Sequence, residues 1–485
     1  MEPLLPLAIR LPPGRGSLLY ELHRQLRTAI VDGRLQPGVR LPSTRALAAT
    51  YGVSRNTAVA TYDLLLSEGY IATHRGSGTR VAESLPRPSN LRPPRRGADT
   101  ADRRVNPGWR LRALRRPSSV AEVPPMSFQL GVPDVTRFPV DVWRRLSNEM
   151  LRTMGSSNTL STDSQGRFAF REAISHHVSY TRAVACGPGD IVVTSGAQQA
   201  FDLLSRILVT PQRTVVALED PGYGRLRSAF TAAGAKISPV PVDDEGIVVE
   251  RVPPDARVIC VTPSHQFPRG CAMSAARRTA LLDLAQSQGA VIIEDDYDGE
   301  FRFTERPLDA LQTLDRTESV FYVGTFSKSL LPTLRLGFVV TPPWARAALV
   351  AAKEVSDGAC CDLTQDIVTA MIRGGHLARH VRRMQRLYGR RRQRLLDDIS
   401  SDLSRWLEPL PSCAGLHVAA VLKSSQEDQE IAARALQQGV GILPLSAFSH
   451  RRDSERGFVF GFGAIEESAI TQALKPLRRA LSAGR

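Results

Sequence analysis

The chain has 485 residues, of which 42% are hydrophobic and 23% are charged, as in globular proteins large enough for at least two domains. No stretch reaches the roughly 20 uncharged apolar residues that a membrane span needs, and the N-terminus lacks a secretory signal. The six cysteines form no CxxC pair, which favours reduced thiols over disulfides or a zinc site. We therefore expect a cytoplasmic protein with no membrane partner and no metal site.

The net charge of +15 is distributed unevenly along the chain. Residues 1–82 contain ten arginines and five acidic residues (+5), and residues 83–124 contain ten arginines and four acidic residues (+6). The remaining 361 residues therefore carry only +4. Positive charge concentrated at one end is typical of a region that meets a polyanion such as a nucleic acid, although basic tails are common in other proteins.

Three regions differ in their sequence pattern. Residues 1–82 show short helical patterns, and residues 83–125 are rich in Pro and Arg, which predicts a linker. From residue 126 to residue 485, β-branched runs alternate with longer helical stretches, which predicts an α/β domain with a mainly parallel sheet flanked by helices. The runs that we expect to be strands are Ile191–Thr194, Thr214–Leu218, Val258–Thr262, Val291–Ile293 and Val320–Val323.

The first region contains the signals of three short helices and a β-hairpin. Apolar residues at helical spacing predict a first helix that ends near Gly33, and Ser43 and Ser54 can cap further helices over residues 44–51 and 55–68. Two short helices around a glycine turn predict a helix-turn-helix, and strands at 70–73 and 80–82 with a glycine-rich basic tip predict a wing. The expected buried stripe of the last helix is Val59, Tyr62, Leu65 and Leu66.

Side chains in the helix pair and the wing are suited to DNA. An arginine can bind guanine, an asparagine can bind adenine, and hydroxyl groups can bind phosphates. The predicted DNA contacts are Ser43, Arg45, Ser54, Arg55, Asn56, Thr57, Arg75, Gly76 and Gly78. Taken singly, these residues are also compatible with a helical dimerisation bundle that carries solvated arginines. The whole segment PSTRALAATYGVSRNTAVATYDLLLSEGYIATHRGSGTRV resembles the GntR family of bacterial regulators, which implies double-stranded operator DNA as a partner.

The large region contains residue types that pyridoxal phosphate requires. That cofactor needs a lysine, an anion at its ring nitrogen, and donors for its phosphate. Lys328 follows an expected strand in the sequence GTFSK, and Asp295 and Tyr297 lie at the end of another. Gly196 precedes a helix whose N-terminus suits a phosphate, and Tyr223 could stack on the ring. Each residue taken alone could instead be a strand cap, a core side chain, a tight turn or a solvated amine.

The sequences TSGAQQAFDLL, EDPGYGR, VTPSHQFPRG, IIEDDYDGEF and GTFSKSLLPTLRLG resemble blocks of fold-type I aminotransferases. They are most similar to the MocR (GabR-like) branch of the GntR family, in which such a domain follows a winged helix. The resemblance implies pyridoxal phosphate held as a Schiff base on Lys328, with Asp295 on the pyridinium, Tyr297 on the ring oxygen and Tyr223 stacked on the ring. It also implies a head-to-tail homodimer, a phosphate site at Gly196, Ala197, Gln198, Thr325 and Arg335, and an effector pocket lined by Arg225 and His265.

Two positions depart from the family pattern. Val459 stands where the family usually has an arginine that binds a carboxylate, and Ser161 stands where it has a tyrosine. A buried carboxylate without a bidentate partner loses on the order of a few kcal/mol. The sequence therefore favours a regulator that senses pyridoxal phosphate, or an amine or amino-acid-like effector, and alters operator binding, and not an enzyme. The alternatives are a working aminotransferase with a DNA-binding head, and a dimerisation scaffold without cofactor.

Overall fold

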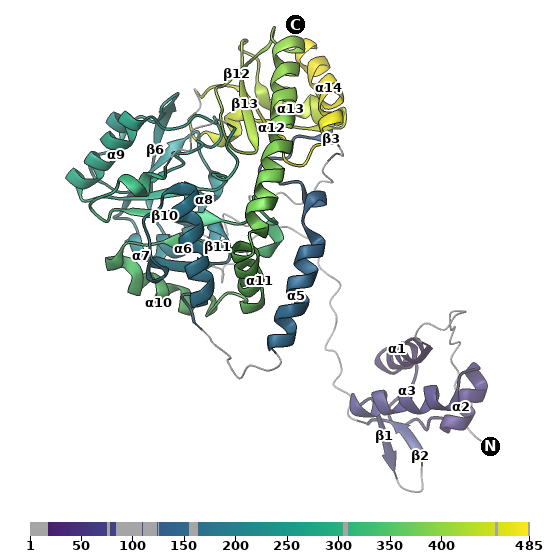
Figure 1. The fold of residues 1–485 in the computed structure, drawn as a ribbon. Coiled ribbons are helices and arrows are strands. Elements are labelled where there is room, and N and C mark those ends of the chain that lie inside the picture. Colours follow the sequence, from purple (N-terminus) through teal and green to yellow (C-terminus); the bar gives the residue numbers. More distant parts are fainter. Residues whose placement is uncertain are drawn as a thin grey trace. The chain divides into compact units, whose positions relative to one another are not determined.

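The computed structural model describes residues 18–74, 78–83, 109, 124, 126–154, 163–303, 309–451 and 454–483. The chain divides into two compact units, residues 1–100 and residues 101–485 (Figure 1). The linker expected at residues 83–125 lies almost entirely outside the described residues, so its boundaries stay a prediction. No helix among the described residues has the length and apolar character that crossing a bilayer requires.

The described residues of the first unit, called the head below, form three helices and a two-stranded antiparallel hairpin, as the sequence predicts. Ser43 Oγ accepts a 3.2 Å hydrogen bond from Ala46 N, and Ser54 Oγ accepts a 3.0 Å hydrogen bond from Thr57 N. Both predicted N-caps are therefore confirmed. The elements are α1 (Leu18–Val31), α2 (Thr44–Tyr51), α3 (Arg55–Ser67), β1 (Ile71–His74) and β2 (Gly78–Val81).

The predicted buried stripe of α3 is wrong in two of its four positions. Tyr62 and Leu65 are buried, but Val59 is 38% exposed and Leu66 is 45% exposed. Successive residues turn by about 100° around a helix, so Val59 and Leu66 lie one step beyond the face that packs inward. That inward face consists of residues spaced three and four apart, namely Ala58, Thr61, Tyr62 and Leu65.

The second unit is built on an eight-stranded, mainly parallel sheet with the order β4-β11-β10-β9-β8-β5-β6-β7. The five neighbouring strands β10, β9, β8, β5 and β6 pair in parallel, whereas β11 and β7 pair antiparallel with their neighbours. All five predicted strands are present. The strands are β4 (Ile191–Thr194), β5 (Val215–Asp220), β6 (Lys236–Asp243), β7 (Gly246–Ile247), β8 (Ala256–Val261), β9 (Val291–Asp296), β10 (Val320–Thr325) and β11 (Gly337–Val340).

Helices cover both faces of this sheet (Figure 1). Apolar side chains of α7, α8 and α10 pack on one face, and those of α6, α9 and α11 pack on the other. Side chains alternate along a strand. Ile293 of β9 therefore packs with α7, α8 and α10 on one face, and Ile292 packs with α9 on the other. The helices of this unit are α5 (Val140–Met154), α6 (Phe168–Arg182), α7 (Ala197–Leu208), α8 (Gly224–Ala232), α9 (Ala275–Gln288), α10 (Arg346–Asp357), α11 (Asp362–Arg373), α12 (His376–Asp402), α13 (Asp428–Gln437) and α14 (Ile470–Ser482).

A smaller antiparallel sheet, which the sequence pattern did not predict, lies in the C-terminal part of this unit. Its order is β12-β13-β16-β15, and helices α12, α13 and α14 pack near it. A separate parallel pair joins β3 to β14. The strands are β3 (Met126–Ser127), β12 (Leu407–Pro409), β13 (His417–Leu422), β14 (Val440–Gly441), β15 (Leu443–Pro444) and β16 (Gly457–Gly461).

Candidate functional site

Asp295 lies near the carboxyl end of β9, where sheets of this kind place their ligands. Its side chain is buried, and its Oδ1 atom has no hydrogen-bond partner among the described residues. Burial raises the pKa of this carboxyl group well above its ordinary value, and the charges of Asp296 and Asp298 raise it further. A buried carboxylate without a partner is costly unless a cation reaches it. The geometry therefore suits a positively charged ligand group at Oδ1.

Lys328 follows β10, in which Val323 pairs with Asp295 of β9. Its Nζ atom donates a 2.5 Å hydrogen bond to Gly131 O. Burial lowers the pKa of the amine, although the carboxylates of Asp298 and Asp295 oppose this shift. A lowered pKa leaves more of the neutral amine that can react with an aldehyde. Gly131 has φ +69°, a backbone conformation that favours glycine.

The turn between β4 and α7 is shaped to hold an anion. The first N–H groups of α7, which begins at Ala197, have no acceptor within the helix and lie at its positive end. Gly196 has φ +79°, and a Cβ there would lie 3.2 Å from the guanidinium group of Arg335. Arg335 Nη2 donates a 2.7 Å hydrogen bond to Ser195 O. The N-terminus of α7 and the guanidinium group of Arg335 therefore lie beside each other at this turn.

Two more residues of the predicted phosphate site lie in the elements that frame this place. Thr325 is the last residue of β10 and is buried, and its Oγ1 atom accepts a 3.1 Å hydrogen bond from Ser327 N. Gln198 Nε2 donates a 3.4 Å hydrogen bond to Arg225 O, whereas Gln198 Oε1 is buried without a partner among the described residues. Arg225 is exposed, and its charge lowers the pKa of Lys328, so it lies within electrostatic range of the amine.

Tyr223 lies at the start of α8 and packs against two aromatic rings. The ring centroids of Phe201 and Phe267 lie 6.4 and 5.4 Å from that of Tyr223, both edge-on. Burial raises the pKa of the Tyr223 hydroxyl, the charge of Asp295 raises it further, and Arg225 lowers it. The tyrosine therefore lies among the charged residues predicted for the cofactor site.

Tyr297 and His265 form a hydrogen-bonded group with two residues that the sequence did not single out. Tyr297 Oη donates a 3.0 Å hydrogen bond to His265 O and also lies 3.0 Å from His265 Nδ1. Asp298 Oδ2 lies 3.1 Å from the same nitrogen, and the His417 ring centroid lies 4.5 Å from that of His265. Donor atoms of His265, Asp298 and His417 lie within 4.8 Å of one another, a spacing open to a metal ion. Hydrogen bonds, including that of His417 Nε2 to Pro268 O, account for this arrangement without an ion.

Val459, the first departure from the family pattern, is fully buried in β16 opposite Ala419 of β13. His417 lies two residues before Ala419, so His417 and Val459 share one face of the small sheet. Burial lowers the pKa of His417 well below its ordinary value, and His265 lowers it further. Neither a valine nor a neutral histidine supplies positive charge on this face. Ser161, the second departure, lies outside the described residues.

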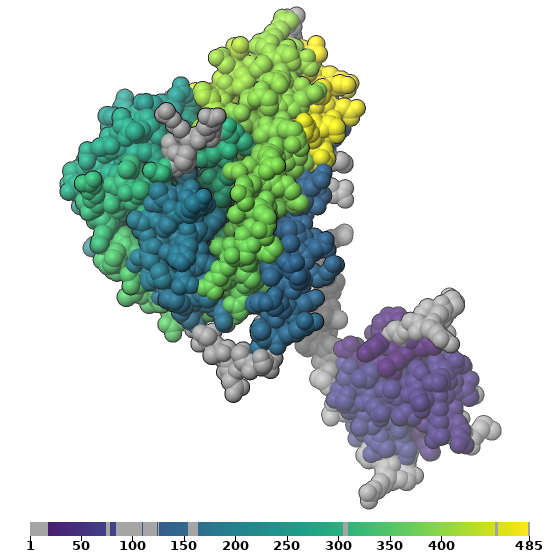
Figure 2. All heavy atoms as spheres, viewed as in Figure 1, coloured from purple at the N-terminus to yellow at the C-terminus, as the bar shows by residue number. Residues whose placement is uncertain are grey.

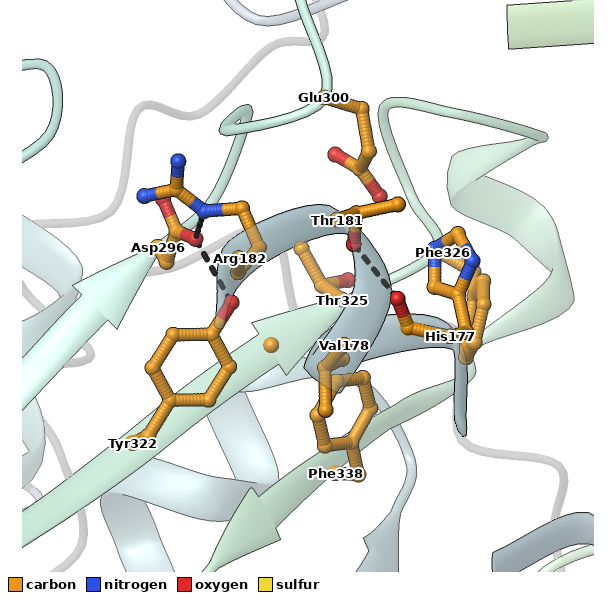
Figure 3. Close-up of a pocket in the computed structure, with 11 residues that line it drawn as sticks. His177, Val178, Thr181, Arg182, Asp296, Glu300, Tyr322, Thr325, Phe326 and Phe338 are labelled. Atoms are coloured by element: carbon orange, nitrogen blue, oxygen red, sulfur yellow. Dashed lines mark hydrogen bonds and ion pairs between the residues drawn. The ribbon is translucent and has the colours of Figure 1, made fainter. Parts of the chain in front are cut away.

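Asp296 follows Asp295 on β9 but faces the opposite side of the sheet. Figure 3 shows its carboxylate between Arg182 of α6 and Tyr322 of β10. Arg182 Nε and Tyr322 Oη each lie 2.6 Å from Asp296 Oδ2 and donate hydrogen bonds to it. Arg182 also donates to Ser264 Oγ. Burial raises the pKa of Glu300, which lines the same small pocket, to about 7. This face of β9 thus carries a buried ion pair.

In the head, the first turn of α3 presents Arg55 and Asn56 to solvent. Ser54 and Thr57 are tied together by the helix cap, with 2.8 Å between their hydroxyl oxygens. Arg45 is exposed on the preceding helix, α2. Of the residues predicted for the wing, Gly78 begins β2, whereas Arg75 and Gly76 lie outside the described residues.

Sequence reasoning missed three residues beside Lys328 and Tyr297. Asp298 follows Tyr297 directly in the acidic run DDYDGE, and that run is a signal that could have identified it. Gly131 and His417 come from segments far from Lys328 along the chain. A single glycine in a loop and a single histidine in an apolar strand give no local signal, so only the fold could reveal them.

Comparison with known families separates the same two parts of the chain. Residues 20–81 match the model for bacterial regulatory proteins of the gntR family, and residues 125–458 match the model for class I and II aminotransferases. The fold and the matches therefore define the class of the protein, in which a GntR-type DNA-binding head precedes a unit with an aminotransferase fold.

Two relatives with this organisation match almost the whole chain. The chain is 34% identical over 466 residues to the probable rhizopine catabolism regulatory protein MocR of Rhizobium meliloti, covering 96% of this chain and 93% of that protein. It is 31% identical over 482 residues to the pyridoxine biosynthesis transcriptional regulator PdxR of Corynebacterium glutamicum, covering 99% of each. The chain belongs to the MocR subfamily of the GntR family of regulators.

Solved structures confirm the predicted fold-type I unit. The kynurenine aminotransferase of Pyrococcus horikoshii superposes with a TM-score of 0.70 at 25% identity, covering 77% of this chain and 96% of that one. The α-aminoadipate aminotransferase LysN of Thermus thermophilus gives a TM-score of 0.68 at 27% identity, covering 74% and 92%. This fold implies dependence on pyridoxal phosphate. The unpartnered Oδ1 of Asp295 and the lowered pKa of Lys328 fit that cofactor.

Proposed function

We propose that this regulator binds operator DNA through its head and senses pyridoxal phosphate, or an amine that reacts with it, through its large unit. The observation that carries the proposal is the buried Oδ1 atom of Asp295, which lacks a partner among the described residues and lies in the electrostatic field of Lys328. Membership in the MocR subfamily supports double-stranded DNA as a partner and a homodimer as the working form.

When bound, pyridoxal phosphate supplies an aldehyde that combines with primary amines. In the proposal, Lys328 holds that aldehyde, Asp295 faces the ring nitrogen and Tyr297 faces the ring oxygen, while Tyr223 covers the ring. The remaining predicted residues take two roles. The phosphate contacts are Gly196, Ala197, Gln198, Thr325 and Arg335, and the effector contacts are Arg225 and His265.

The face of the small antiparallel sheet that carries His417 and Val459 favours a sensor over an enzyme that acts on α-amino acids. Val459 and a neutral His417 share one face of the small sheet, and the family resemblance implies that an arginine at the position of Val459 pairs with a substrate carboxylate. A carboxylate brought there would lose a charge-assisted, bidentate partner. We therefore expect the signal to be pyridoxal phosphate itself or an amine that places no α-carboxylate against this face of the small sheet.

The cofactor proposal is tested with Lys328→Ala, compared with the exposed Lys475→Ala as a matched control. We expect the wild-type protein and the control to bind pyridoxal phosphate with a visible absorption band and to be labelled at one lysine after borohydride reduction. The Lys328→Ala protein should lose both the band and the label. Labelling at another lysine, or a protein that takes up no cofactor, contradicts the proposal.

The sensor proposal is tested by measuring DNA affinity and turnover on the same preparation. We expect affinity for a selected duplex to change when pyridoxal phosphate or a simple amine is added, because an effector must bind two states unequally. Steady transamination of amino donors and 2-oxo acids, without any change in DNA affinity, would instead establish a working aminotransferase.

The DNA-reading role of α3 is tested with Arg55→Ala, compared with Arg34→Ala. Arg34 is exposed in the turn after α1, and its ion pair among the described residues is with Asp32. Loss of a base contact should weaken binding to the selected duplex by about 1–3 kcal/mol and relax sequence preference at one position. The Arg34→Ala protein should retain its preference. Unchanged preference in Arg55→Ala would show that another residue reads the base.

A further inference from the structure

Among the helices that the structure describes, the densest run of positive charge lies in the large unit and not in the head. The 30 residues from 367 to 396 contain nine arginines and no aspartate or glutamate. The average charge of the large region hides this run, because acidic residues elsewhere compensate for it. Most of the run belongs to α12, which lies at the surface beside α5 (Figure 2).

The arginines of α12 are confined to the outer side of the helix. Arg382 and Arg383 are adjacent, and each lies three or four residues from both Arg379 and Arg386; all four are exposed. The opposite side is buried and mostly apolar, including Leu377, Val381, Met384, Tyr388 and Leu395. Residues at these spacings share one face of a helix. The helix is thus held in the core by one side and presents guanidinium groups on the other.

A fifth arginine joins this group from α5. Arg145 Nη2 lies 3.3 Å from His376 Nε2, and Arg379 Nη2 lies 2.8 Å from His376 Nδ1. Partial burial and the two guanidinium groups lower the pKa of His376, as expected where positive charge accumulates. We call Arg145, Arg379, Arg382, Arg383 and Arg386 the arginine face.

The arginine face lacks the acidic partners that neutralise its neighbours. Further along α12, Arg390 pairs with Glu467 and Arg394 pairs with Asp398. Among ion pairs between described residues, none involves a member of the arginine face. Like charges four residues apart destabilise a helix by about 0.2–0.5 kcal/mol per pair, so this arrangement works against the stability of α12. A polyanion bound to the face would relieve that repulsion.

We propose that the arginine face is a second DNA-binding surface, which holds the phosphate backbone of a duplex without reading its sequence. It goes beyond the proposed function by assigning DNA contacts to the sensor unit as well as to the head. The four arginines of α12 span about 10 Å of helix, and a duplex presents one phosphate per about 1.7 Å of its axis. Several phosphates therefore lie within reach of the face at once.

Two other occupants fit the face less well. Helices that bind membrane surfaces carry bulky apolar side chains beside their cations, whereas α12 has no large hydrophobic residue among the exposed ones of the described chain. The head of the same chain carries a net +5 over residues 1–82 and is repelled by more positive charge. A duplex that the head already binds is present at high effective concentration.

The test compares a triple variant, Arg379→Ala, Arg382→Ala and Arg386→Ala, with a matched triple, Arg213→Ala, Arg251→Ala and Arg316→Ala. The matched arginines are also exposed and form no ion pair with a described residue, so both variants change the net charge equally. Alanine favours an exposed helix, and retention of the cofactor band checks the fold. Binding of the full chain to a random duplex of about 60 base pairs is measured over a range of salt concentrations.

Each phosphate contact contributes about 0.9 to the slope of log affinity against log salt. We expect the slope of the α12 triple variant to fall by about 2 to 3, and that of the matched triple by less than about 1. The difference in slope between the two triple variants should persist when both also carry Arg55→Ala. This control distinguishes DNA contacts of the arginine face from those of the head. Equal slopes in the two triples overturn the proposal. The proposal is also overturned if the α12 triple variant has an unchanged slope on DNA but loses binding to anionic vesicles or changes its oligomeric state.

Discussion

Asp295 and Asp296 are adjacent residues of the same strand, yet they have opposite surroundings. Asp296 Oδ2 receives hydrogen bonds from Arg182 and Tyr322 on one face of the sheet. Asp295 forms no ion pair with a described residue on the other face. The Oδ1 atoms of both carboxyl groups are buried without a hydrogen-bond partner among the described residues, so the ion pair is what separates the two residues. The period of two along a strand places the two carboxyl groups in separate environments. One of them forms a buried ion pair within the fold, and the other is the residue that we propose to face the cofactor.

This difference teaches how a structural carboxylate can be told from a functional one. Both residues are buried and both are acidic, so neither burial nor residue type separates them. The presence or absence of an ion pair with a described residue does, because a buried charge is retained only where it is paired. Removing the partner of Asp296, or replacing the carboxylate of Asp295, is therefore the most direct test of this distinction.

The largest effect is expected from Arg182→Ala, which leaves Asp296 buried without its cation. Removing one partner of a buried pair costs about 3–5 kcal/mol of unfolding free energy, measured by chemical denaturation. Arg206→Ala is the control, because it breaks an exposed pair with Asp202 and should cost less than about 1 kcal/mol. A similarly small loss in Arg182→Ala would show that Asp296 does not depend on its partner.

The next effect is expected from Asp295→Asn and concerns the cofactor. Hydrogen bonds to charged groups contribute about 1.5–3 kcal/mol, so affinity for pyridoxal phosphate should fall about 10- to 100-fold. Titration of the cofactor-free protein, followed by the visible band, measures this loss. The exposed Asp283→Asn should bind as the wild type does. Unaltered affinity in Asp295→Asn would place the ring nitrogen elsewhere.

Much of the fold could be predicted from sequence, because its signals are local. The caps at Ser43 and Ser54 and all five expected strands of the large sheet depend on a few neighbouring residues. Strand ends were less accurate, since β9 continues to Asp296 where charged residues end the apolar pattern. The small antiparallel sheet was missed because its strands are short and its partners are distant in sequence.

The candidate site could be predicted only in part. Motifs led to Lys328, Asp295 and Tyr297, and the family resemblance singled out Asp295, but residue type alone does not distinguish Asp295 from its identical neighbour Asp296. Their difference depends on Arg182, more than a hundred residues away. The arginine face was missed for another reason, because charge summed over a long region averages out a run confined to one helix.

The smallest effect concerns the cofactor-free protein and depends on pH. Burial, together with Asp296 and Asp298, raises the pKa of Asp295 well above its ordinary value of 3.8. A group whose pKa is raised on folding stabilises the protein fully below its unfolded pKa, and this contribution is lost as pH rises toward the folded pKa. The wild type should therefore lose stability relative to Asp295→Asn as pH increases, by about 1.4 kcal/mol at one pH unit above the unfolded pKa.

Denaturation of both proteins between about pH 3 and pH 5 measures this difference, and groups common to both cancel. With pyridoxal phosphate bound, the pyridinium favours the carboxylate form of Asp295. The relative stability of the wild type should then rise with pH, which is the opposite sign. A difference that does not vary with pH in the cofactor-free protein would mean that Asp295 is already paired, as Asp296 is, and the contrast between the two residues would disappear.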